Sequence, residues 1–197
     1  MTTLLSEVKE QLGPQGIEQL SRTLGADKET VEKATAASIP LLLTALSRNA
    51  AEPEGAQSLY TALEEDHDGS VLGNLDAVYA NPQAFDGAEI LGHIFGANRE
   101  PVEGDLSKGT GLNPNATALL LQILAPIVMG LIGKKLRGSG MDAGGLSGLL
   151  GGQTKEAEAA QPGLMGSITK ILDRNSDGSV LDDLQRFAGG LFGRKDN

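Results

Sequence analysis

The sequence contains no cysteine, no tryptophan and few aromatic residues. The absence of cysteine excludes disulfides, thiolate zinc sites and thiol nucleophiles. Aromatic residues make up 3% of the chain, whereas hydrophobic residues make up 40%. The core must therefore consist mainly of Leu, Ile, Val and Ala, which suits closely packed helices. The N-terminal residues lack a basic start followed by an apolar run, so we expect no signal peptide and a cytoplasmic protein.

Charge is distributed unevenly along the 197 residues. The formal net charge is −10, and residues 1–110 carry 18 acidic against 7 basic side chains. An acidic first half repels phosphate backbones and makes nucleic acid an unfavourable partner. Catalytic signatures such as a nucleophile elbow, a phosphate-binding loop or a dinucleotide fingerprint are missing. We therefore expect a protein that is not an enzyme.

Apolar periodicity predicts an all-α fold. Helices are expected at 3–12, 15–24 and 28–47, with a kink or break near Pro40, and shorter ones at 56–63, 72–79 and 86–96. Residues 97–113 have the composition of a loop, and residues 114–136 form the longest apolar helix. We expect three parts: a helical domain (1–137), a Gly-rich flexible linker (138–163) and a C-terminal helix–acidic loop–helix unit (164–197).

Two acidic segments repeat the same pattern. Residues 63–75 align without gaps on residues 172–184, and both contain DGSVL with Leu at matching positions. In the second segment, oxygen-bearing side chains fall at the spacing of a calcium loop, although Leu184 occupies the closing position that normally holds Glu. The candidate calcium ligands of this loop are Asp173, Asn175, Asp177, Ser179, Asp182 and Asp183.

The first acidic segment is a weaker calcium candidate. Its possible ligands are Glu64, Asp66, Asp68 and Ser70, followed by Gly73-Asn74 where the second copy has two carboxylates. A purely structural interpretation stays open for both loops, because Ser179 and Asp182 also form a helix capping box after a common Asp-Gly turn.

The quoted segments also resemble a known family. DHDGSVL, DGAEILGHIFG, LLLQILAPIVMGLIGKK and DRNSDGSVLDDLQRFAGGLFG together resemble the YidB-like family, bacterial domain of unknown function 937, over nearly the whole chain. The resemblance implies a bacterial, mainly helical protein, with a homeodomain-like arrangement reported for one branch. It implies no established activity, and the calcium hypothesis does not derive from it.

Three functional hypotheses remain after these observations. The leading one is a helical binding or scaffold protein that contacts a protein partner or its own copies through apolar helix faces, with calcium-binding acidic loops. A second is a helix-turn-helix DNA-binding protein using Arg22, Lys28 and Lys33, although Glu29 and Glu32 would also face the DNA. A third is membrane association through 116–133, although we favour a buried central helix for this segment, and a face shared with another subunit is a further alternative.

The two histidines do not have the spacing of a zinc site. Neither His67 nor His93 is followed by a further ligand three or four residues later in a zinc-like pattern. We expect His67, within the first acidic segment, to be solvated. We expect His93, within an apolar helix, to pack against neighbouring helices.

Overall fold

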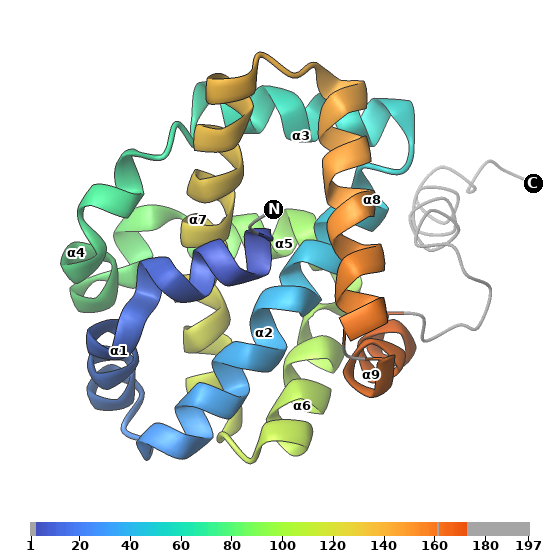
Figure 1. Cartoon of the computed structure of the whole chain (residues 1–197). Coiled ribbons are helices and arrows are strands. Elements are labelled where there is room, and N and C mark those ends of the chain that lie inside the picture. Colours follow the sequence, from blue (N-terminus) through green and yellow to red (C-terminus); the bar gives the residue numbers. More distant parts are fainter. Residues whose placement is uncertain (1–2, 161, 173–197) are drawn as a thin grey trace, which may run out of the picture.

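The fold is all-α, as the sequence predicts, and the computed structural model describes residues 3–160 and 162–172. Within these ranges there is no β-strand. The α-helices are α1 (Leu4–Leu24), α2 (Lys28–Asn49), α3 (Pro53–Glu65), α4 (Leu75–Ala80), α5 (Gly87–Phe95), α6 (Arg99–Thr110), α7 (Pro114–Ser139), α8 (Ala143–Ala160) and α9 (Pro162–Leu172). Three short 3₁₀ helices join them: η1 (Ser70–Gly73), η2 (Pro82–Phe85) and η3 (Gly96–Asn98). Figure 1 shows the other helices arranged around α2 and α7.

The first helical region bends at the predicted position. Gly13 has φ 57° and ψ −178°, so it divides α1 into two helical halves just before Pro14. Gly25 ends α1 in the left-handed conformation, where glycine has no steric penalty, and Asp27 accepts a hydrogen bond from the Thr30 amide to cap α2. The same hydrogen bond lowers the pKa of the Asp27 carboxyl from its usual value. These boundaries confirm the helices expected at 3–12, 15–24 and from Lys28 onward.

Of the kink or break expected near Pro40, the break does not occur. Helix α2 continues to Asn49, with Pro40 buried inside it. Proline removes one helical N–H and costs about 3 kcal/mol in an exposed helix. Here the surrounding residues from Ile39 to Leu46 are all buried against other helices, and that burial holds the helix together. Thr44 also donates its hydroxyl to the Pro40 carbonyl at 2.7 Å.

The loop expected over 97–113 is largely a helix. Helix α6 buries Val102 and Leu106, although its sequence is polar and contains glycine. Arg99 stabilises its start by pairing with Glu103 at 2.8 Å and by donating to the Ala88 carbonyl at 2.8 Å. Together with the buried Ser107 and Thr110, these side chains pack a segment whose composition is that of a loop into a helix.

Helix α7 forms the centre of the core. Asn113 caps its first turn through the Ala116 amide, and residues 123–133 are all buried. The most apolar 18-residue window of this helix has a mean hydropathy of 2.1 and is 83% buried within the protein. It is the one helix in the described ranges long and apolar enough to cross a membrane. Its burial fits the core interpretation of the apolar segment.

Residues 138–163 are not a flexible linker in the structure. Most of them form α8, which packs on α2 and α3 and buries Leu146 and Leu150 completely. Gln153 also accepts a hydrogen bond from the Leu4 amide at 2.5 Å and so ties α8 to α1. Glycines at exposed positions interrupt the apolar periodicity of this segment, so the periodicity did not predict the helix. The second acidic loop and the helix expected after it lie outside the described residues.

Candidate functional site

The first acidic segment forms a tight turn between α3 and η1. Gly69 adopts φ 92°, and the Asp68 carboxylate accepts a hydrogen bond from the Ser70 amide at 2.8 Å. Hydrogen bonding from the Ser70 side chain, and then from its amide, lowers the pKa of Asp68 below its usual value. The turn is thus stabilised by its own side chains, with Asp68 and Ser70 exposed to solvent.

This turn is seated directly on small residues of α7. A Cβ atom at Gly133 would lie 1.8 Å from the His67 carbonyl oxygen, and one at Gly130 would lie 2.4 Å from Val71 Cγ1. Arg137 donates a hydrogen bond to the Glu64 carbonyl oxygen on the other side of the turn. The turn formed by DHDGSVL in this copy therefore has a packing function against α7.

The metal candidates of the first loop are not gathered around a common point. Glu64, Asp66, Asp68 and Ser70 are all exposed, and the described residues include no group of three His, Asp or Glu side chains placed to hold a metal ion. The second loop, with Asp173, Asn175, Asp177, Ser179, Asp182 and Asp183, lies outside the described residues. Calcium binding there stays a prediction.

A groove lies between the C-terminal end of α2, α3 and α5. Its volume is about 840 Å³. The floor is apolar and is formed by Leu46, Leu59, Ala62, Ile90, Ile94 and Met129. Polar side chains occupy its walls and rim: Arg48, Asn49, Glu52, Glu54, Ser58, His67 and His93. We call this feature the α3–α5 groove.

The rim of the α3–α5 groove contains both histidines of the chain. Their environments are the reverse of those expected from the sequence, because His67 is half-buried and His93 is exposed. Burial lowers the pKa of His67 below its usual value of 6.5, against the opposing effect of Asp66 and Asp86. The folding of α3 and η1 onto α7, which brings His67 to the groove, leaves no signature in local sequence.

The end of α2 supplies a fixed wall of the α3–α5 groove. Asn49 donates its side-chain amide to the Ile94 carbonyl at 3.1 Å and thereby joins α2 to α5. Beside it, Arg48 Nη1 is buried and has no hydrogen-bond partner in the part of the chain that the structure describes. A buried guanidinium donor without a partner is costly, so this nitrogen favours an acceptor entering the groove.

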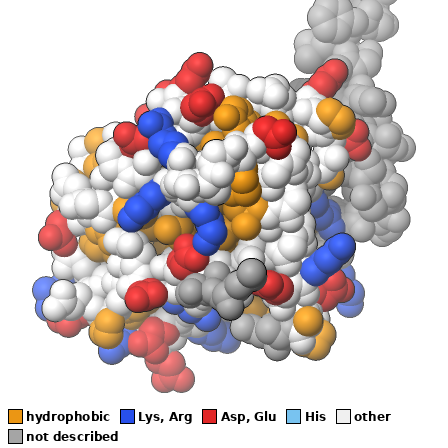
Figure 2. Space-filling view, turned by 45° about the horizontal axis from the view of Figure 1, so that its top comes forward, with side chains coloured by type: hydrophobic (Ala, Val, Ile, Leu, Met, Phe, Trp, Pro, Cys, Tyr) orange, Lys and Arg blue, Asp and Glu red, His pale blue; other side chains and the backbone are white. Residues whose placement is uncertain are grey.

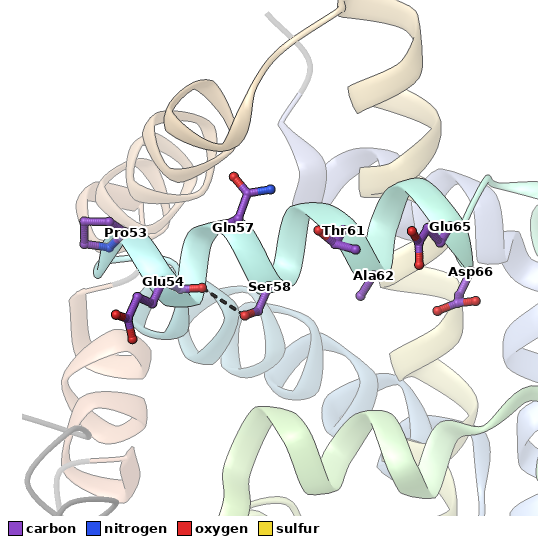
Figure 3. A pocket seen from close by; sticks show the side chains of 8 residues that line it. All are labelled: Pro53, Glu54, Gln57, Ser58, Thr61, Ala62, Glu65 and Asp66. Atoms are coloured by element: carbon purple, nitrogen blue, oxygen red, sulfur yellow. Dashed lines mark hydrogen bonds between the residues drawn. The ribbon is translucent and has the colours of Figure 1, made fainter.

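Helix α3 separates the groove from a shallower hollow on its outer face. Figure 3 shows Ser58, Ala62 and Glu54 on one side of α3 and Gln57 pointing the other way. Ser58 Oγ donates to the Glu54 carbonyl at 2.9 Å. Gln57 lines only the outer hollow, whereas Ser58 also lines the α3–α5 groove. Gln57 and Ser58 are neighbours and both are exposed, so substitutions at these two positions compare the outer side of α3 with its groove side.

The basic residues of the helix-turn-helix hypothesis have acidic neighbours one turn away. Arg22 pairs with Glu18, and Lys28 lies 3.6 Å from Glu32. On the face drawn in Figure 2, Lys and Arg side chains are interspersed with Asp and Glu, and a narrow strip of hydrophobic side chains is exposed between them. The pairing of Arg22 and Lys28 with acidic side chains lowers the positive charge that these two residues offer to a phosphate backbone.

Comparison with protein families gives one match. The model of the family described as bacterial protein of unknown function, DUF937, matches residues 6–135. The chain belongs to the DUF937 family. No curated protein and no solved structure shows significant similarity to it.

The DUF937 match is shorter than the resemblance drawn from the sequence, which extends to the closing acidic segment. It ends within α7, so α8 and α9 lie beyond it. The α3–α5 groove, formed by residues between Leu46 and Ile94 together with Met129, lies entirely inside it. The groove is thus part of the DUF937 domain itself.

Proposed function

We propose that the protein is a non-enzymatic helical binding protein whose α3–α5 groove receives an amphipathic helix of a protein partner. The observation that carries this proposal is the combination of an apolar floor with a buried, unpartnered Arg48 Nη1 at one wall. Helix-in-groove recognition uses apolar anchors on one helix face and a few polar contacts that set the register.

The walls of the groove define the chemistry of the partner. Leu59, Ile94 and Met129 favour aliphatic or aromatic anchors, while Arg48 favours a carboxylate. Glu52 and Glu54 lie at the exposed start of α3, beside the end of α2, and favour a basic residue near that carboxylate on the partner helix. The apolar faces of α7 are largely used within the chain, which makes the α3–α5 groove the better candidate for partner contacts.

The test compares two neighbouring positions on α3. A peptide is selected from a library of amphipathic helical peptides with the full chain as bait, and its affinity is measured by fluorescence anisotropy. Ser58→Arg places a bulky side chain in the groove and should weaken binding about tenfold or more, equivalent to about 1.4 kcal/mol. Gln57→Arg, on the other side of α3, should leave binding unchanged. Equal effects of the two variants would overturn the proposed site.

Calcium binding is a separate part of the proposed function. It rests on the spacing of Asp173, Asn175 and Asp177 in the sequence. The bound ion would fix the angle between α9 and the segment that follows it, as in other calcium helix pairs. Self-association is a further proposal, and it would use the same groove, with a helix of a second copy as partner.

A further inference from the structure

The described chain ends beside the α3–α5 groove. Leu172, the last residue of α9, lines a small hollow together with Arg48, Asn49 and Ile94. These three residues also line the groove. The segment that follows Leu172 therefore begins next to Arg48, whose Nη1 is buried.

The segment that follows has the pattern of a groove-binding helix. Its apolar residues recur at helical spacing: Val180, Leu181, Leu184, Phe187, Ala188, Leu191 and Phe192. A helix over 180–192 is about 20 Å long at 1.5 Å per residue, and α3, with 13 residues, is about as long. Residues 173–179 can span roughly 23 Å when extended, which is ample for a connection within one chain.

The charges of the two surfaces are complementary. Asp182 and Asp183 stand at the start of the predicted helix, which is the end nearest to Leu172 and hence to Arg48. Arg194 and Lys195 follow its end. The start of α3 lies at the same end of the groove as Arg48, since a Cβ at Gly55 would lie 1.9 Å from the Asn49 carbonyl oxygen. A helix that begins at Arg48 and runs along α3 therefore brings its basic end towards the exposed Glu65 and Asp66 at the other end of α3.

We propose that residues 180–192 form an amphipathic helix that occupies the α3–α5 groove of their own chain. This inference rests on the proposed function, because it names the occupant of the same groove. An occupant carried by the same chain has an effective concentration in the millimolar range. It therefore blocks the groove until a partner of higher affinity, or an event in the connecting segment, displaces it.

Paired cysteines test the position of the segment in the full chain. The protein contains no native cysteine, so Ser58→Cys with Ala188→Cys gives a single possible intramolecular disulfide. This pair should form the intramolecular disulfide at least about tenfold faster than Gln57→Cys with Ala188→Cys, because only Ser58 faces the groove. Equal rates, or disulfides formed mainly between two chains, would overturn occupancy within one chain.

A competition experiment separates this inference from the proposed function. The probe is a fluorescent peptide with the sequence of residues 176–197, added to the full chain and to the variant Leu184→Glu/Phe187→Glu. In the variant, the two Glu side chains should keep its own segment out of the groove. The peptide should therefore bind the variant at least about tenfold more tightly than it binds the wild-type chain. Equal, measurable affinity for both chains would overturn the occupancy but keep the groove as a binding site. Absence of binding to both would overturn the proposed groove as well.

Discussion

At the scale of single residues, two glycines of α7 explain how the first DGSVL segment packs. Gly130 and Gly133 let the turn approach the backbone of α7, and any side chain at Gly133 would meet the His67 carbonyl. The His67 carbonyl is backbone, and Val71 Cγ1 is attached directly to Cβ. A clash with an added side chain could therefore be relieved only if the turn moved away from α7. The role of this segment is therefore fixed by packing, whether or not the turn also binds an ion.

Gly133→Ala should destabilise the protein. The added Cβ would lie 1.8 Å from the His67 oxygen, and overpacking of this kind costs about 1–3 kcal/mol. Chemical denaturation should show this loss. The control is Gly138→Ala in the same helix, where the added carbon meets nothing within 4 Å and should instead stabilise by about 0.5–1 kcal/mol. Similar stabilities for the two variants would contradict the close seating of the turn on α7.

His67 should make stability depend on pH. Burial holds its folded-state pKa below the usual 6.5, so the unfolded chain takes up the proton first as the pH falls below that value. The stability linked to neutral His67 is present above pH 6.5 and is lost as the pH falls through the folded-state pKa. Thermal melts between pH 7.5 and pH 5 should therefore show a smaller decrease for His67→Gln than for the wild type.

The control for this prediction is His93→Gln. His93 lies on the same groove but is exposed, so its replacement removes a groove histidine without removing a buried imidazole. The interpretation would be wrong if both variants changed the melts to the same extent, because the effect would then come from the groove as a whole and not from the burial of one imidazole.

At the scale of elements, the sequence predicted the helices that have clear caps or strong apolar periodicity. It did not predict α6 and α8, in which glycine and polar residues separate the few apolar ones. The Gly13 break, the Gly25–Asp27 junction and the start of α7 have local signals, because capping residues and positive-φ glycines act within one turn. Helices α6 and α8 form because a few side chains are buried by distant helices. The groove was likewise not predictable, since its walls come from segments brought together only by tertiary packing.

Leu150→Ala tests whether α8 is a structural element. Leu150 is fully buried, and truncation of such a leucine costs about 2–5 kcal/mol. Its neighbour Leu149 is only half-buried, so Leu149→Ala should cost clearly less in the same urea titration. Equal and negligible effects would restore the flexible-linker interpretation of residues 138–163.

The second acidic loop gives a further prediction at this scale. If Asp173, Asn175 and Asp177 hold calcium, the wild-type melting temperature should be higher with calcium than with chelator. At a calcium concentration of one hundred times the dissociation constant, binding adds about 2.7 kcal/mol to the free energy of unfolding. Asp177→Ala should abolish this shift. Asp68→Ala, in the first loop, should keep it. A shift that persists in Asp177→Ala would place the ion elsewhere, and no shift in the wild type would leave the segment as a capped turn.

At the scale of the whole molecule, the hydrophobic core extends to residues beyond the end of the family match. The DUF937 match ends at residue 135, yet α8 and α9 bury Leu146, Leu150, Met165, Ile168 and Leu172 against the rest of the protein. Helix α8 covers α2 and α3, and Gln153 ties it to the start of α1. The matched region thus shares its hydrophobic core with the helices that follow it.

Truncation should reveal this shared core. A chain ending at Gly140 loses α8 and α9 and exposes the apolar surface of α2 and α3, whereas a chain ending at Leu172 keeps every described helix. The shorter chain should melt at a much lower temperature or bind a hydrophobic dye, because losing the five buried side chains of α8 and α9, at about 2–5 kcal/mol each, is comparable to the whole stability of a typical domain, about 5–15 kcal/mol. Equal melting of both chains would instead show that residues up to Gly140 form an autonomous domain, with α8 and α9 as an addition to it.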